Sequence, residues 1–285
     1  MFIRRFICGL AVVVVMTSTA AAQDTSAQDT PRVVTLGDFL GLRTVQTTVA
    51  GQTSGFILDT GGGISVVSPA LAEAAGCEPW GQITGFRLTG ERLTMPRCDG
   101  LALNVDGVSL VSPSAGLFDL SPLLPPDAPR IDGLIALDSL QAQPFTLELG
   151  AGRLTFETPA SLARRIGGAV EVPIRFHRQA GGASLTVMAR VMTPRGALWM
   201  QLDSGSDAPI LLARTSAEPL GLDPEVARQP LRLSIAGART GVIEAEVDAR
   251  VRDMIIDGNI GLPVMRDWIM TFDLKAEKLW ITPVA

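Results

Sequence analysis

The sequence predicts a mainly β protein built from two similar halves. Short runs of alternating apolar and polar residues, separated by Gly and Pro, dominate the chain and are typical of strands joined by turns. Two apolar runs, residues 56–58 and 198–202, each end in an Asp that is followed by a small hydroxyl residue and a Gly. Few stretches have helical character, so we expect sheets to form the core.

A second landmark supports an internal repeat. Asp132 and Asp257 each precede a Gly and an apolar stretch, and they lie 125 positions apart. The same spacing recurs in the apolar segments that follow them. Asp59 and Asp203 lie 144 positions apart, so the first copy has 19 more residues between its acid and the later landmarks. The Pro-rich segment 121–129 is the natural place for part of this surplus.

Each acid follows an apolar strand, which is costly unless the carboxylate is hydrogen-bonded or shared. We therefore expect Asp59 and Asp203 to meet. Two carboxyl groups about 3 Å apart cannot both ionise, so the pair would keep one proton and one negative charge over a broad pH range. Such a pair supplies an acid and a base in one place. Its members titrate as a unit, so neither role is assigned to one residue.

The two loops resemble those of the aspartic peptidases, in which two Asp-Thr/Ser-Gly loops meet at a pseudo-twofold axis. The resemblance is carried by Asp59–Gly61 and Asp203–Gly205, and the stretches around Gly133 and Gly258 are similar to the segments that support each loop. It covers nearly the whole mature chain and is closer to two fused retropepsin-like units than to the larger pepsin type. It implies a bilobed aspartic-protease (acid protease) fold with a cleft between two pseudo-twofold-related lobes.

The resemblance also implies a function. The chain would be an aspartic endopeptidase, a hydrolase that cuts extended peptide or unfolded protein with a water activated between Asp59 and Asp203, and it would need no cofactor. Other loop residues would support the pair through hydroxyls that bond across the lobes and amides that bond the carboxylates. These residues are Thr60, Gly61, Ser204, Gly205 and Ser206. Since both acids lie in one chain, a monomer should suffice.

Two positions depart from the family pattern. The residue after the loop glycine is Ser206 in the second copy but Gly62 in the first, and Ala136 stands where the second copy has Gly261. An added methyl group in a packed support can shift a loop, and small shifts can cost large rate factors. Two alternatives follow: a catalytically weak or inactive bilobed peptide-binding module of the same fold, and a structural β protein whose acids are hydrogen-bonded turn residues.

The chain opens with a basic, then apolar, then small-residue segment at residues 1–22, which predicts a secretory signal peptide. The alternative is an uncleaved membrane anchor. Residues 23–32 are polar and small and predict a linker. Residues 33–160 and 169–285 would form the two lobes, joined by 161–168, where the strand pattern lapses. We expect a periplasmic or secreted protein without stable membrane insertion after signal cleavage.

Strands and one short helix are predicted along the first lobe. Alternating residues at 45–49 and the apolar run at 56–58 predict strands. Ser68 is a favourable N-cap, the next residue is Pro, and Gly76 is a helix stop, so a helix is expected between them.

The next segments leave one question open. Gly85, Phe86 and Gly90 predict a hairpin tip, which is either a flap over the cleft or an ordinary surface hairpin. In the second lobe, the alternation at 185–191 and the turn at 194–196 predict the strands that lead to the second acid.

Cysteine, histidine and charge exclude several classes. An oxidising location favours a disulfide between Cys77 and Cys98, with two separate buried thiols as the alternative. Neither has a second Cys or a His at metal-ligand spacing, so no metal site is expected. The one histidine, His177, is expected at the surface, which argues against Ser-His-Asp and Cys-His sites. The net charge of −5 provides no basic field for nucleic acid.

Overall fold

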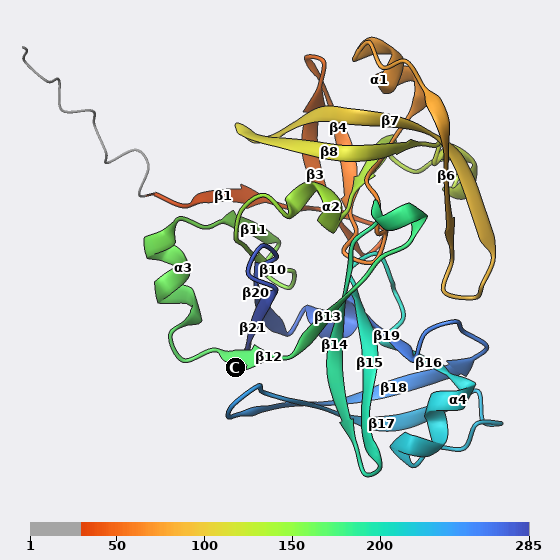
Figure 1. The fold of residues 1–285 in the computed structure, drawn as a ribbon, viewed down its shortest axis with the longest axis vertical. Coiled ribbons are helices and arrows are strands. Elements are labelled where there is room, and N and C mark those ends of the chain that lie inside the picture. Colours follow the sequence, from red (N-terminus) through yellow and green to blue (C-terminus); the bar gives the residue numbers. More distant parts are fainter. Residues whose placement is uncertain (1–29, 285) are drawn as a thin grey trace, which may run out of the picture.

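The computed structural model describes residues 30–284, which form three β-sheets and several short helices (Figure 1). The predicted signal peptide, residues 1–22, lies outside the described residues, as does most of the predicted linker, residues 23–32. Arg32, the last residue of that linker, instead begins strand β1 (Arg32–Thr35), because it pairs with Phe156. Within residues 30–284, no helix has the length and apolar character needed to cross a bilayer.

The first sheet belongs to the N-terminal half and has the strand order β2-β3-β4-β9-β5-β8-β7-β6. Strand β3 also pairs with β7, which closes the central strands into a barrel. Strands β4 and β9 are parallel, and β5 lies antiparallel beside β9. The strands are β2 (Gly37–Phe39), β3 (Leu42–Val49), β4 (Gln52–Leu58), β5 (Val66–Val67), β6 (Trp80–Phe86), β7 (Arg92–Val105), β8 (Val108–Leu117) and β9 (Ile131–Ile135).

The second sheet repeats this plan in the C-terminal half, with the order β13-β14-β15-β19-β16-β18-β17. Strands β15 and β19 are parallel, and β16 lies antiparallel beside β19, as β5 does beside β9. The repeat expected from the sequence is therefore present in the topology. The strands are β13 (Ile174–His177), β14 (Thr186–Thr193), β15 (Gly196–Asp203), β16 (Ile210–Ala213), β17 (Arg228–Ala236), β18 (Val242–Arg252) and β19 (Gly258–Gly261).

The third sheet joins the halves, with the order β1-β11-β10-β20-β21-β12. At its centre, β10 and β20 are antiparallel, and Thr146 lies opposite Thr271, which is 125 positions later. The two hydroxyl oxygens are 2.9 Å apart, so equivalent residues of the two halves meet at the centre of this sheet. The Phe145 and Phe272 rings stack beside them with centroids 5.0 Å apart. The strands not yet bounded are β10 (Phe145–Glu148), β11 (Arg153–Phe156), β12 (Val170–Val172), β20 (Trp268–Asp273) and β21 (Lys278–Pro283).

The helices are short and lie between strands. Helix α1 (Pro69–Ala74) begins where the sequence predicts, because the Ser68 hydroxyl accepts the Leu71 N–H at 3.4 Å. Helix α3 (Pro159–Ile166) is capped by Thr158 and covers most of the predicted connection at 161–168. The other helices and 3₁₀ turns are α2 (Leu137–Leu140), α4 (Arg214–Ala217), α5 (Leu262–Met265), η2 (Ser121–Leu123), η3 (Ala180–Gly182) and η4 (Glu218–Leu220).

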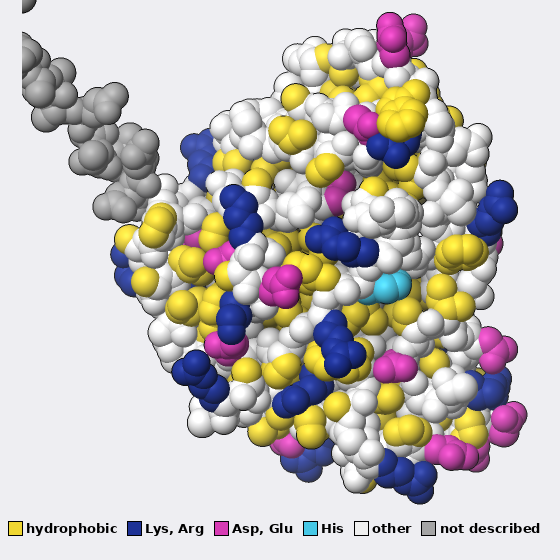
Figure 2. Space-filling view, in the orientation of Figure 1, with side chains coloured by type: hydrophobic (Ala, Val, Ile, Leu, Met, Phe, Trp, Pro, Cys, Tyr) yellow, Lys and Arg dark blue, Asp and Glu magenta, His cyan; other side chains and the backbone are white. Residues whose placement is uncertain are grey.

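One continuous apolar core runs through all three sheets, and Phe56, Phe145 and Phe272 are among its largest fully buried side chains. The predicted disulfide between Cys77 and Cys98 is present and ties the end of helix α1 to strand β7. On the face shown in Figure 2, basic and acidic side chains are interspersed rather than gathered in a patch of one sign.

Candidate functional site

Each acid lies where a buried strand ends beside a parallel neighbour. Strand β4 ends at Leu58, and the next residue, Asp59, donates its N–H to the Ile135 carbonyl of β9 at 2.9 Å. Strand β15 ends at Asp203, which lies opposite Gly261 of β19. Because the two strand pairs are arranged alike, the acids emerge at matching points of the two halves.

The two loops approach so closely that only glycine fits at their contact. A Cβ atom placed on Gly61 would lie 2.3 Å from Asp203 Cγ, and one placed on Gly205 would lie 2.5 Å from Asp59 Cγ. The Gly61 and Gly205 N–H groups each donate to the Oδ1 atom of their own loop's acid at 2.9 Å. The loops that carry Asp59 and Asp203 are therefore in contact, and each acid lies against the glycine of the other loop.

Four hydrogen bonds interlock the loops below the acids. The Thr60 hydroxyl donates to the Leu202 carbonyl at 2.8 Å and accepts the Ser204 N–H at 3.0 Å. The Ser204 hydroxyl does the same in reverse, donating to the Leu58 carbonyl at 2.7 Å and accepting the Thr60 N–H at 3.0 Å. Both hydroxyl residues are completely buried. The relative position of the two carboxyl groups is therefore set by backbone as well as side-chain contacts.

Burial governs the ionisation of the carboxyl pair. Burial raises the pKa of Asp59, although hydrogen bonds from Asp203 and from the Gly61, Gly62 and Gly205 amides oppose this rise. Burial and then the negative charge of Asp59 raise the pKa of Asp203 well above its ordinary value. Asp203 is buried and Asp59 is half-buried. Ionising both would place two negative charges side by side in a poorly solvated site, which favours a state with one proton on the pair.

The two departures from the sequence pattern have structural reasons. A Cβ atom on Gly62 would lie 2.9 Å from Asp59 Oδ2, so the first loop has no room for a side chain there. Ala136 is fully buried, and its N–H donates to Ser65 Oγ at 3.0 Å. At the matching Gly261 a Cβ atom would lie 1.9 Å from the Ala208 carbonyl oxygen. The first support segment accepts a methyl group that the second one excludes.

A buried polar cluster holds the first loop from behind. Ser65, which follows the glycine turn, donates its N–H and its hydroxyl to Asp138 Oδ1 at 2.9 and 2.7 Å. Ser112 donates to Asp138 Oδ2 at 3.1 Å. Asp138 is almost fully buried in the first turn of α2. It anchors Ser65 and, through it, the turn that carries Asp59.

The acids line a cleft of about 540 Å³ between the halves. Strands β6 and β7 form a hairpin that extends from the first half toward the second (Figure 1). Gly85 and Phe86 of this hairpin line the cleft, and Gly90 lies in its turn, where its N–H donates to the Arg87 carbonyl at 2.9 Å. The Phe86 N–H donates to Gln179 Oε1 at 2.7 Å, and the Ile255 N–H donates to the Leu88 carbonyl at 2.9 Å. These two bonds tie the hairpin to the C-terminal half.

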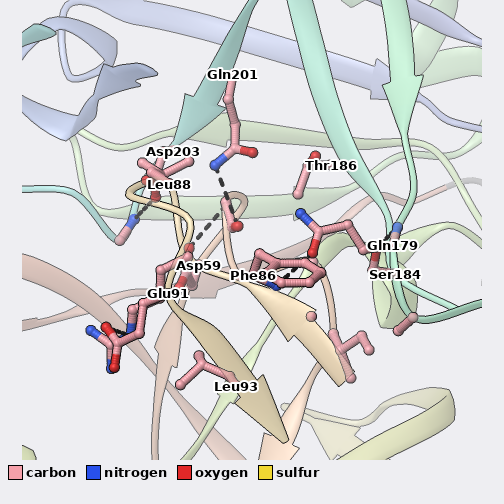
Figure 3. Close-up of a pocket in the computed structure, with 18 of the residues that line it drawn as sticks. Asp59, Phe86, Leu88, Glu91, Leu93, Gln179, Ser184, Thr186, Gln201 and Asp203 are labelled. Carbon is pink, nitrogen blue, oxygen red and sulfur yellow. Dashed lines mark hydrogen bonds and ion pairs between the residues drawn. The ribbon is translucent and has the colours of Figure 1, made fainter. Parts of the chain in front are cut away.

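The two walls of the cleft differ in chemistry. The N-terminal half contributes mainly apolar side chains together with Arg87, Thr89 and Glu91 of the hairpin, and the C-terminal half contributes most of the neutral polar side chains together with Leu211, Ile255 and Ile256 (Figure 3). The apolar set includes Ile64, Val66, Ile83, Met95, Phe118 and Leu134, and the polar set includes His177, Gln179, Ser184, Thr186 and Gln201.

The sequence singled out none of the polar set as site residues. His177 in particular was expected at the surface, but it is half-buried and lines the cleft, because the turn after β13 folds toward the hairpin tip. The local pattern carried no signal for these positions, since the opposing wall comes from a distant part of the chain. Within residues 30–284, no group of three His, Cys, Asp or Glu side chains is placed to hold a metal ion.

The fold and site together define a mainly β protein of two similar halves with a carboxyl pair between them. The solved structure of basic 7S globulin from soybean has a similar fold, with a TM-score of 0.55 and 12% sequence identity over 88% of this chain and 94% of that chain. At this identity the similarity concerns the fold alone. No protein-family model and no curated protein matches the chain.

These comparisons overturn the predicted family assignment. The loop motifs resemble those of the aspartic peptidases, yet no family model matches the chain, and a solved structure with a similar fold is a globulin. The chain is therefore not assigned to the retropepsin-like or pepsin-like peptidases. Two tripeptide motifs describe how the carboxyl loops are built, and one fold can carry different functions.

Proposed function

We propose that this chain binds an extended peptide or unfolded polypeptide segment in the cleft between its two halves, with Asp59 and Asp203 on the cleft floor. The carrying observation is that both acids line a cleft of about 540 Å³ whose lining includes residues of the β6–β7 hairpin. Its concave shape, largely apolar N-terminal wall and few convergent polar groups are typical of a binding site.

We also propose a specific relation between the two halves of the fold. The two halves would act as the two lobes of a bilobed aspartic-protease fold, related by a local twofold axis that would pass between Thr146 and Thr271. The matching strand orders of the two main sheets support this description.

A second candidate function, hydrolysis of the bound peptide, is favoured by one specific observation. The two acids meet at the cleft with Asp203 buried and Asp59 half-buried, and the raised pKa values of both members support a proton held between them. In this reaction the ionised carboxylate takes a proton from a water whose oxygen attacks the peptide carbonyl. The protonated partner donates to the carbonyl oxygen as negative charge develops there. Collapse of the intermediate breaks the C–N bond, and the leaving nitrogen takes a proton from the pair.

We further propose that this protein is exported and acts as a monomer. The Cys77–Cys98 disulfide supports an oxidising location, such as the periplasm or the outside of the cell. Since both acids belong to one chain, a monomer would contain the complete site.

The test measures binding and cleavage of an unfolded, reduced protein from about pH 3 to about pH 7, beside the Asp59→Asn and Asp203→Asn variants. Binding without cleavage supports the binding module. Cleavage that either substitution abolishes in a folded variant supports hydrolysis by the pair, and its pH profile reports the apparent pKa values of the pair. A folded chain that neither binds nor cleaves any unfolded substrate refutes both candidates.

A further inference from the structure

The two halves differ in chemistry at one pair of equivalent strand positions beside the acids. In each half, the residue two positions before the acid lies opposite a residue of the neighbouring parallel strand, which is β9 in the N-terminal half and β19 in the C-terminal half. In the N-terminal half this pair is Ile57 and Leu134. In the C-terminal half it is Gln201 and Asn259. The two halves thus have the same strand pairing at this position, but the N-terminal half has two apolar side chains where the C-terminal half has two carboxamides.

The carboxamide pair is held in place around the first loop. Gln201 is only 4% exposed, and its Nε2 donates to the Gly61 carbonyl at 3.4 Å and to Asn259 Oδ1 at 3.3 Å. Figure 3 shows the Gln201 amide directed toward this loop from β15. Asn259 is fully buried, and its side chain lowers the pKa of the neighbouring Asp203, although its Nδ2 makes no hydrogen bond of ordinary geometry.

In the carboxamide pair, the Gln201 side-chain oxygen, Oε1, is available to accept a hydrogen bond from a ligand. The Gly61 carbonyl can only accept, so the contact orients the Gln201 amide with its nitrogen toward the loop. Among the described residues, Gln201 Oε1 has no hydrogen-bond donor, and Gln201 lines the cleft. This oxygen keeps contact with solvent in the cleft, so a ligand that covers it without supplying an N–H or O–H group leaves it desolvated and unpaired, which is costly.

The surrounding polar groups are mostly occupied by the protein itself. Ser184 Oγ accepts the Gln179 N–H, and the Thr186 hydroxyl donates to the His177 carbonyl at 3.4 Å. Gln179 Oε1 accepts the Phe86 N–H of the hairpin. Gln201 is therefore the acceptor nearest to the acids along β15 that is free for a ligand, while Leu134 presents an apolar surface from the opposite half.

We propose that Gln201 gives the cleft an unequal selectivity: a large apolar side chain lies against the N-terminal wall, and a neutral side chain with a hydrogen-bond donor, a carboxamide or a hydroxyl, lies against Gln201. This inference rests on the proposed peptide binding and names its substrate class. An apolar side chain at the second position would leave Gln201 Oε1 without a partner, which should weaken binding by about 10-fold or more.

The experiment compares short peptides that contain Leu next to Gln, Thr, Leu or Lys, each in both orders along the chain. Selectivity is the ratio of dissociation constants, or of kcat/KM values if the peptides are cleaved. The wild-type chain should prefer the Gln and Thr peptides over the Leu-Leu peptide by about 10-fold or more. Gln201→Leu, which gives the C-terminal half an aliphatic residue as at Ile57, should abolish or reverse that preference.

Gln46→Leu is the matched control, because Gln46 is an exposed glutamine on β3 and its replacement should leave the preference unchanged. Gln201→Met, whose side chain has nearly the same length, is a second variant that removes the carboxamide if Gln201→Leu does not fold. The comparison of peptides on the wild-type chain does not depend on the folding of any variant. Equal affinity for Leu-Leu, the tightest binding of Lys, or a preference that persists in Gln201→Leu overturns the inference while leaving peptide binding intact. Failure of every peptide to bind refutes the proposed function itself.

Discussion

The anchoring carboxyl group of Asp138 predicts a specific dependence of stability on pH. Asp138 accepts hydrogen bonds from Ser65 and Ser112, and among the described residues no basic side chain contributes to the shift of its pKa. Burial raises the pKa of Asp138 from 3.8 to about 6, because hydroxyl and amide donors only partly replace the water that the ionised form loses. The perturbation is Asp138→Asn, which keeps the shape of the neutral acid.

The magnitude follows from the difference between the two pKa values. A difference of about 2 units, at about 1.36 kcal/mol each, amounts to about 3 kcal/mol. Between about pH 4 and about pH 6 the unfolded chain has lost this proton and the folded chain retains it, so the contribution of Asp138 to stability falls as the pH rises. It is fully present below about pH 4 and lost above about pH 6.

The assay is urea unfolding of the wild type and Asp138→Asn at about pH 4, 5, 6 and 7. The carboxyl pair titrates in both proteins, so its effect largely cancels in the difference. We expect Asp138→Asn to gain about 3 kcal/mol relative to the wild type between pH 4 and pH 7. The exposed Asp127→Asn is the control and should show no such trend. A difference that is constant with pH, or that changes in the opposite direction, would refute the reasoning.

Three further predictions concern the parts that hold the site. Replacing Ser204 with Ala leaves a buried N–H and a buried carbonyl of the first loop without partners, so urea unfolding should show a loss of about 2–4 kcal/mol; a loss below about 0.5 kcal/mol would contradict the role of the interlock. Replacing Cys77 and Cys98 with Ser removes a cross-link of sequence separation 21 and should cost about 3 kcal/mol in the chain-entropy estimate, whereas equal stability of the oxidised and reduced wild type would argue against it. Gly261→Ala places a methyl group against a backbone carbonyl and should cost about 3 kcal/mol in thermal or urea unfolding, while Ala136→Gly should cost about 1 kcal/mol; equal losses would show that the two supports are packed alike.

Much of the architecture could be predicted from local pattern. Strand alternation indicates sheets, and the matching landmarks indicate two copies, because equivalent backbones need the same strand and turn chemistry at each repeat. The start of α1 follows from the Ser68 cap and the Pro that follows it. The meeting of Asp59 and Asp203 follows from the cost of burying a lone carboxylate.

Family membership could not be predicted in this way. The Asp-Thr-Gly and Asp-Ser-Gly tripeptides describe a tight turn that supports a carboxyl group, and that requirement is independent of what the surrounding protein does. The comparisons contradict the family assignment while the geometry of the turns remains. Local chemistry determines how such a turn is built, whereas turnover depends on the whole cleft.

By itself, the sequence determined the mainly β character, the duplicated plan, the two carboxyl loops and the cysteine pair, because each depends on residues a few positions apart or on one repeated spacing. Only the tertiary structure decided the shared central sheet, the anchoring of Ser65 by Asp138, and the unequal walls of the cleft. The bond between Phe86 and Gln179, for example, joins residues 93 positions apart. Such contacts depend on how the two halves pack, and no local periodicity encodes which side chains meet there.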